Sequence, residues 1–115
     1  AAPAAAPLAA GGPPRLLLRL PEDRRGTLIR MAVRDHYVDV VTDRGQASVL
    51  MRFRDALAEV DGVDGLQVHR SHWVALAGVE GAQKSGDRVH VLTRDGERVP
   101  VSRAYRADLV ARGLL

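Results

Sequence analysis

Three short polar clusters interrupt an otherwise apolar, strand-like sequence, and each of them contains an arginine. They lie at residues 34–37, 69–72 and 102–105 and read Arg-Asp-His-Tyr, His-Arg-Ser-His and Ser-Arg-Ala-Tyr. Guanidinium groups, imidazoles, hydroxyls and backbone amides are the groups with which proteins hold phosphates and read base edges. Each cluster falls where a strand should end, and loops held by a rigid scaffold commonly carry function. The clusters therefore favour recognition of an anion, with nucleic acid as the leading class.

The same residue types could also support catalysis, so a small β enzyme that uses His36 and His69 is a further hypothesis. His36, an aspartate beside it and either Ser71 or Ser102 could form a Ser–His–Asp set. Such sets are defined by geometry rather than by composition, and the sequence contains no Gly-x-Ser-x-Gly motif. We therefore predict that the chain is not an enzyme, has no catalytic residues and takes no small-molecule substrate.

Metal and cofactor sites are disfavoured by spacing and by composition. Histidine imidazoles could serve as ligands, but on a single strand His69 and His72 would point to opposite faces. The sequence lacks the glutamate of the His-Glu-x-x-His zinc motif and lacks a glycine-rich phosphate loop. It has no cysteine, which excludes a disulfide, a thiolate metal site and an iron–sulfur cluster. We predict no metal and no cofactor.

Charge is distributed unevenly along the 115 residues, a length that suits one domain. Residues 15–65 hold nine arginines and nine acidic residues, whereas residues 66–115 hold seven arginines and Lys84 against five acids. The net charge of +3 therefore arises in the second half. A basic half indicates an anionic partner such as nucleic acid. The competing interpretation is that Arg70 and Arg103 are surface arginines paired with acids.

Short apolar runs separated by turn signals predict a mostly antiparallel β protein. Helical spacing of Phe53, Ala56, Leu57 and Val60 predicts one short helix over 53–60. Asp-Gly at 95–96 predicts a hairpin, and Pro100 predicts an edge strand. Ser102 is expected to cap a final helical turn that ends at Gly113. The expected strands are 16–20, 27–33, 37–42, 46–51, 66–68, 73–76, 79–83, 88–93 and 98–101.

Residues 1–14 are uncharged and rich in proline and alanine, which predicts a disordered linker before a domain at 15–115. The chain begins at Ala1 rather than at methionine, so we expect a fragment that lacks an upstream membrane or sensory segment. No apolar run approaches the ~20 residues that a transmembrane helix needs. We predict a cytoplasmic domain, either free or attached to a membrane anchor.

The order of the three clusters resembles the LytTR DNA-binding domain of bacterial response regulators. The matching text is Asp-His-Tyr-Val-x-Val-x-Thr at 35–42, Leu-Gln-Val-His-Arg-Ser-His-Trp-Val at 66–74 and Gly-Glu-Arg-Val-Pro-Val-Ser-Arg at 96–103. The short helix at 53–60 falls between the first two segments, as it does in that family. The resemblance covers about residues 15–112.

The resemblance implies an elongated β-β-β arrangement of small antiparallel sheets with one short helix and a C-terminal helical turn. It implies sequence-specific binding to double-stranded DNA as the output domain of a transcription regulator. The loops of the family enter adjacent major grooves, usually at tandem direct repeats where a second copy binds. The DNA contacts would come first from His36, Arg70 and Arg103, and then from Ser71, Ser102, Tyr37 and Lys84. His69 would either brace its loop or touch DNA, while Trp73 belongs to the core.

A second hypothesis starts from the same resemblance. The leader at 1–14 resembles the junction in LytTR proteins whose N-terminal half consists of membrane helices. Such proteins are tethered regulators or partners that restrain other regulators. The chain could therefore be a protein-interaction module that holds a partner regulator, and the modest net charge suits that role.

Overall fold

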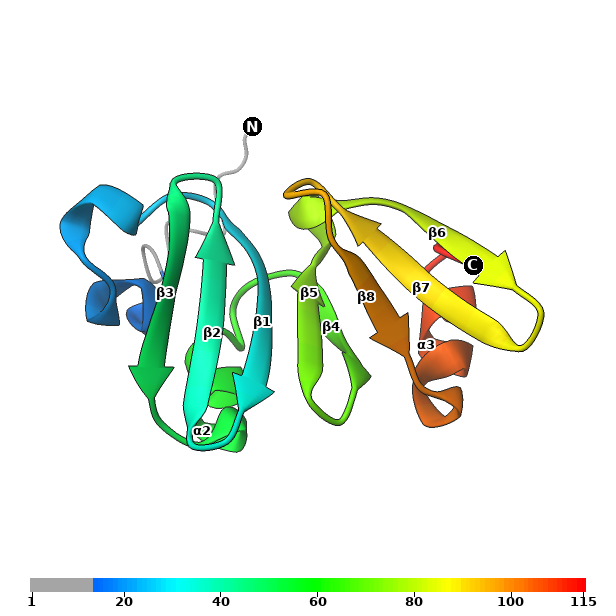
Figure 1. The fold of residues 1–115 in the computed structure, drawn as a ribbon, viewed down its shortest axis with the longest axis horizontal. Helices are drawn as coiled ribbons and strands as arrows, with labels where there is room; N and C mark the ends of the chain where they lie inside the picture. The colour runs from blue at the N-terminus through cyan, green and yellow to red at the C-terminus, as the bar shows by residue number, and fades with distance from the viewer. Residues whose placement is uncertain (1–13) are drawn as a thin grey trace.

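Eight strands form two antiparallel sheets in the computed structural model, which describes residues 14–115 (Figure 1). The five-stranded sheet has the order β3-β2-β1-β5-β4, and the three-stranded sheet has the order β6-β7-β8. The two sheets lie side by side in a body of 41 × 35 × 23 Å. The mostly β fold class is confirmed. The strands are β1 (Leu28–Arg34), β2 (Tyr37–Thr42), β3 (Gly45–Leu50), β4 (Gly65–His69), β5 (His72–Ala75), β6 (Val79–Ser85), β7 (Arg88–Thr93) and β8 (Arg98–Val101).

Short helices complete the fold. The predicted helix is present as α2 (Phe53–Glu59), and the predicted C-terminal turn is α3 (Arg106–Ala111). Within residues 14–115, no helix has the length and apolar character needed to cross a membrane. Residues 1–13, which hold nearly all of the predicted linker, lie outside the described part of the chain. Four 3₁₀ helices are present among the described residues: η1 (Arg15–Arg19), η2 (Glu22–Arg24), η3 (Leu76–Gly78) and η4 (Arg103–Tyr105).

The strand predicted at 16–20 is wrong, because this segment forms the 3₁₀ helix η1. Its backbone closes on itself, with the amide of Leu17 donating to the Pro14 carbonyl at 3.0 Å. Leu16 and Leu20 are buried whereas Leu18 is 60% exposed, so one side of a helical turn faces the core. The apolar run therefore reflects docking of a helix onto the sheet rather than pairing within it.

The first hydrophobic core lies between the five-stranded sheet and the helices η1 and α2. Alternate strand residues such as Met31, Val38 and Val40 point into it, as the two-residue period of a strand requires. Ala47, Val49 and Met51 pack against this core, which confirms that they share one face. Trp73 is 5% exposed and belongs to the same cluster, as predicted.

The β4–β5 hairpin belongs to both halves of the molecule. Trp73 and Ala75 of β5 face the first core, while Val74 between them faces a second core. The second core also contains Val68 of β4, and Val89, Val91, Val99, Val101 and Leu109 from β7, β8 and α3. Because one hairpin contributes side chains to both cores, it fixes the three-stranded sheet relative to the five-stranded sheet.

An ion pair joins the two sheets directly. Arg30 of β1 donates through Nε to Asp95, in the β7–β8 turn, at 2.9 Å, and Thr93 Oγ1 donates to the same carboxylate at 2.5 Å. Both charged side chains are largely covered, at 13% and 20% exposure. Burial alone would raise the pKa of Asp95, but the hydrogen bonds from Thr93 and Arg30 outweigh it and hold the pKa below its ordinary value.

Replacing Asp95 with alanine is expected to lower the free energy of unfolding by about 1–3 kcal/mol, because charged hydrogen bonds in a covered site are lost. The Arg112–Asp64 pair is the control, because it has the same 2.9 Å separation while Asp64 is 73% exposed. Asp64→Ala should cost at most ~1 kcal/mol. Urea denaturation measures both variants. Equal losses in the two would contradict the importance of the covered pair.

Candidate nucleic-acid interface

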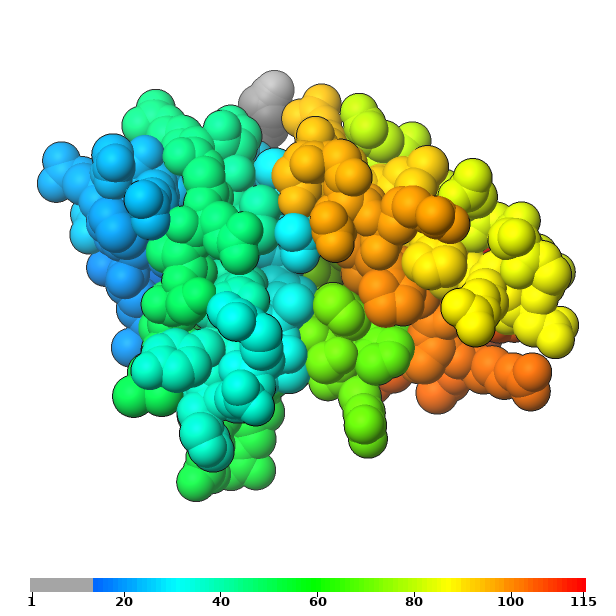
Figure 2. All heavy atoms as spheres, in the orientation of Figure 1, coloured from blue at the N-terminus to red at the C-terminus, as the bar shows by residue number. Residues whose placement is uncertain are grey.

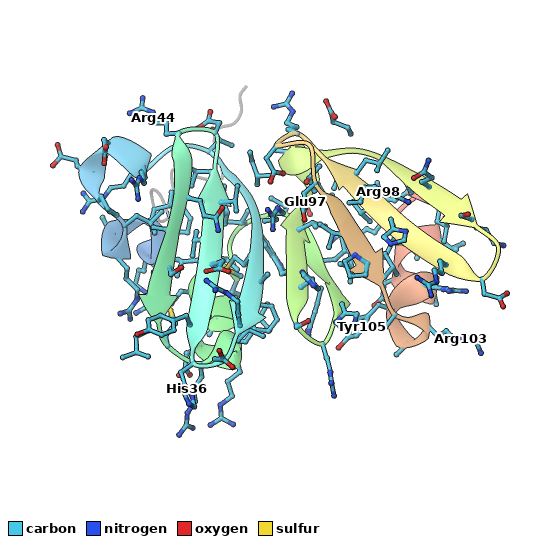
Figure 3. All side chains as sticks on the ribbon, in the orientation of Figure 1. His36, Arg44, Glu97, Arg98, Arg103 and Tyr105 are labelled. Atoms are coloured by element: carbon cyan, nitrogen blue, oxygen red, sulfur yellow. The ribbon has the colours of Figure 1, made fainter. Side chains whose placement is uncertain are left out.

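The three polar clusters meet along one edge of the molecule. The β1–β2 turn, the β4–β5 turn and the β8–η4 junction all lie at the lower edge in Figure 1. We call this the recognition edge and define it by residues 34–37, 69–72 and 102–105. Figure 3 places His36 near one end of the edge and Arg103 near the other. In the space-filling view, the β4–β5 turn projects between the β1–β2 turn and the three-stranded sheet (Figure 2).

The first loop presents His36 at its tip. Asp35 adopts a left-handed conformation with φ +56°, which aspartate tolerates better than most residues and which allows the tight turn. The His36 carbonyl accepts a hydrogen bond from the Met51 amide at 3.2 Å, so the backbone of the turn is held while the imidazole stays exposed. Tyr37 is 46% exposed, opposite Leu50. Its ring is therefore available at the surface beside His36.

The second loop is braced by His69. The Ser71 amide donates to Nδ1 of His69 at 3.2 Å, and Ser71 Oγ lies 2.9 Å from the same nitrogen. Because Nδ1 accepts from an amide, the proton of the neutral ring is on Nε2. Sequence reasoning left open whether His69 braces the loop, and the geometry gives it that role. Arg70 is held at the exposed tip of the turn.

The assumption that His69 and His72 lie on one strand is wrong. They are partners across the β4–β5 hairpin, and their rings meet edge-to-face with centroids 5.3 Å apart. The argument that these two imidazoles point to opposite faces, which had disfavoured a shared metal ion, therefore fails. Among residues 14–115 there is no cluster of three or more potential metal-ligating side chains, so the paired rings are an isolated contact in the described structure.

The third loop follows β8. The hydroxyl of Ser102 makes no capping hydrogen bond, so the predicted side-chain cap is wrong. The turn is closed instead by the Ser102 carbonyl, which accepts from the Tyr105 amide at 3.0 Å. The hydroxyl therefore stays available beside Arg103, which is exposed at the start of η4.

Two backbone hydrogen bonds connect the three loops. The Val33 amide, beside the first loop, donates to the Ser71 carbonyl in the second loop at 2.9 Å. The Ser102 amide, in the third loop, donates to the Val68 carbonyl just before the second loop at 3.0 Å. The spacing between the loops is thus set by main-chain contacts rather than by flexible side chains.

The arginines of the recognition edge that were predicted to contact DNA have no acidic partner. Ion pairs in the described structure involve Arg19, Arg30, Arg34 and Arg112. Neither Arg70 nor Arg103 has a described carboxylate within 4.0 Å, which argues against the interpretation of these two as paired surface arginines. Their guanidinium forks can therefore bind an external acceptor.

Lys84 and Arg52 lie outside the three loops that define the recognition edge, and each lies near one of them. Lys84 lies in β6 opposite Val89 of β7, and Val89 pairs on its other side with Val101 at the end of β8. Arg52 lines the same hollow as His36, because the chain passes from β3 to α2 beside the first loop. Sequence reasoning did not single out Arg52. Its position directly after a strand was a signal that could have been used.

His72 lies just inside the recognition edge and is disposed to stay neutral. Burial is the main cause that lowers the pKa of His72, and the neighbouring His69 and Arg30 lower it further. Its Nδ1 is covered and has no hydrogen-bond partner in the described structure. A proton on this ring would therefore be poorly accommodated in the folded protein.

This arrangement predicts that the protein loses stability as the pH falls. The unfolded chain protonates His72 near the ordinary pKa of about 6.5, while the folded protein keeps it neutral to lower pH. The unfolded state then binds more protons, so the free energy of unfolding falls below pH ~6.5, with a slope of at most about 1.4 kcal/mol per pH unit from one group. Urea denaturation between pH 7.5 and pH 5 measures this slope. His72→Leu should flatten it, and the exposed His36→Gln should not; an unchanged slope in His72→Leu would contradict the assignment.

Comparison with known proteins identifies both the domain type and the fold. The LytTR family model, described as the LytTr DNA-binding domain, matches residues 27–113. A solved structure of the LytTr DNA-binding domain of a methyl-accepting/DNA response regulator from Bacillus cereus matches with a TM-score of 0.60 and 18% identity. The match covers 76% of this chain and 80% of that chain. The comparison with curated proteins gives no match.

Proposed function

The chain belongs to the LytTR family of DNA-binding domains, and we propose that it binds duplex DNA sequence-selectively as the output domain of a bacterial transcription regulator. The observation that carries this proposal is the recognition edge: exposed Arg70 and Arg103, without acidic partners, on loops joined by backbone hydrogen bonds. Base readout needs unpaired donors in fixed positions. The family is a DNA-binding family rather than an enzymatic one, which agrees with the expectation that the chain is not an enzyme.

The length of the molecule suits adjacent major grooves. The longest extent is 41 Å, and one turn of B-DNA is about 34 Å long. His36 and Arg103 lie toward opposite ends of the recognition edge (Figure 3), and we propose that they enter successive major grooves on one face of the duplex. Arg70, on the β4–β5 turn, would then lie over the DNA between the contacts of His36 and Arg103.

Each proposed contact residue has a role that follows from its chemistry. Arg70 and Arg103 offer bidentate forks that match guanine in the major groove, and His36 offers one ring nitrogen. Hydroxyls such as those of Ser71, Ser102 and Tyr37 suit the sugar–phosphate backbone. Lys84, a single positive charge in the row of β6 that leads through Val89 to Val101, suits a phosphate beside the third loop. His69 acts by holding Arg70 in place.

We propose tandem direct repeats as the target, with a second copy of the chain on the second repeat. A net charge of only +3 supplies little non-specific attraction. Two copies on neighbouring sites would compensate, because their contacts add along the duplex. Light scattering with and without a two-repeat duplex should show pairing only on DNA.

The experiment that tests the proposal is a binding selection from a random duplex pool at ~150 mM salt, where non-specific binding is weak. The wild-type chain is expected to enrich a repeated motif. Arg44→Ala is the control for loss of an arginine outside the recognition edge. Arg44 lies at the opposite end of the five-stranded sheet, so this variant should enrich the same motif as the wild type (Figure 3). Failure of the wild type to enrich any motif would overturn the proposal and favour the protein-interaction hypothesis.

A further inference from the structure

A second basic feature lies beside Arg103, in a hollow of about 280 Å³ between β7, β8 and η4. The charged and aromatic side chains that line it are Asp87, Arg88, His90, Arg103 and Arg106, with Pro100 of β8 between them. Arg88, His90 and Arg106 are not among the residues that define the recognition edge. The hollow lies where β7 begins and β8 ends, and it is therefore continuous with the recognition edge.

Strand periodicity places the basic groups on the outer face of the three-stranded sheet. Val89 and Val91 point into the second core, so the alternate residues Arg88 and His90 point outward. Pro100 pairs with His90 across the sheet, on the edge strand β8. The small ring of Pro100 leaves open space on this face, and Arg88 and Arg106 line that space.

The hollow holds more positive than negative side chains, because Asp87 is the one acidic residue that lines it beside three arginines. Neither Arg88 nor Arg106 has a described carboxylate within 4.0 Å. Arg106 is positioned by a hydrogen bond from Nη2 to the carbonyl oxygen of Asp87, while its Nε is covered and has no partner in the described structure. Nδ1 of His90 is likewise without a partner. Two guanidinium groups around an open space, one of them held by a backbone carbonyl, suit an anion rich in acceptor oxygens.

We propose that this hollow binds a backbone phosphate of the same DNA duplex, held by the guanidinium groups of Arg88 and Arg106. The inference rests on the proposed function and adds a phosphate anchor next to the base-reading Arg103. A phosphate held here would fix the register of the third loop in its groove. Phosphate contacts of this kind set orientation and affinity without reading sequence.

The test compares the wild-type chain with Arg88→Gln on two duplexes, the enriched motif and a scrambled sequence, between 50 and 200 mM salt. Arg88→Gln should weaken binding to both duplexes by a similar factor, leave their affinity ratio unchanged, and make the salt slope shallower by about 0.9. Arg98→Gln is the matched control: it removes the same charge from the same sheet, and Arg98 pairs with Leu92 away from the hollow. Its slope should equal that of the wild type.

Each outcome distinguishes this inference from the proposed function. A wild-type chain that selects a motif, with an unchanged salt slope in Arg88→Gln, overturns the phosphate site alone. Equal effects of Arg88→Gln and Arg98→Gln also overturn it, because they indicate only a general charge effect. A wild-type chain that binds no duplex overturns both proposals. Saturable binding of inorganic phosphate, followed through the ring signals of His90, without any DNA binding would assign the hollow to the free anion instead.

Discussion

Replacing Arg103 with alanine is expected to lower the sequence selectivity of the protein. Affinity for the enriched duplex should fall by roughly 5- to 150-fold, the equivalent of about 1–3 kcal/mol for one bidentate contact to guanine. Affinity for a scrambled duplex should change much less. The fold should survive, because Arg103 is exposed and η4 is closed by the backbone of Ser102 and Tyr105. Equilibrium titrations of both duplexes at one salt concentration give the two affinities.

Arg103→Lys makes this experiment sharper. Lysine keeps the positive charge but loses the planar fork, so it retains a phosphate contact and loses bidentate base readout. We therefore expect Arg103→Lys to keep the salt slope of the wild type while losing selectivity. A lysine variant as selective as the wild type would show that Arg103 acts only through its charge. Circular dichroism spectra that match those of the wild type exclude misfolding as the cause.

Most of the fold can be predicted from sequence because its strands and turns carry local signals. The strands between residues 27 and 101 alternate apolar and polar residues, and their turns carry local signals such as Asp-Gly at 95–96, where Gly96 has φ +85°. The leucine-rich segment at 16–20 has neither this alternation nor a turn signal. Its conformation depends on docking against the first core, and the ion pair between Arg19 and Glu59 at 2.6 Å joins residues far apart in sequence. Local pattern could not reveal that partner.

The positions of the three loops could be predicted from sequence, but the contacts that connect them could not. Arg70 and Ser71 carry none of the glycine or asparagine signals of a two-residue hairpin turn, so the β4–β5 hairpin could not be recognised from local sequence. The turn is stabilised instead by His69, which accepts from the Ser71 amide. The backbone links from Val33 and Ser102 to this hairpin are equally invisible in sequence, because they join segments far apart in the chain.

Replacing Trp73 with alanine is expected to cause the largest loss of stability, because this side chain supports the hairpin on which the other loops depend. Trp73 is 5% exposed and lies between Met31 of β1 and Gln67 of β4 in the sheet. Truncation of a buried tryptophan costs about 3–5 kcal/mol. The total stability of a small domain is only about 5–15 kcal/mol, so Trp73→Ala should remove a large part of it.

The loss should extend to DNA binding, because the Ser71 and Val68 carbonyls that hold the first and third loops belong to the same hairpin. Trp73→Phe should recover most of the stability and the DNA affinity, and Leu18→Ala, at a side chain that is 60% exposed, should change stability by no more than ~0.5 kcal/mol. Urea denaturation followed by circular dichroism is the suitable measurement, since Trp73 is the only tryptophan in the chain. A loss below ~1 kcal/mol in Trp73→Ala would mean that the hairpin is held mainly by its backbone links, and DNA affinity would then be expected to survive the substitution.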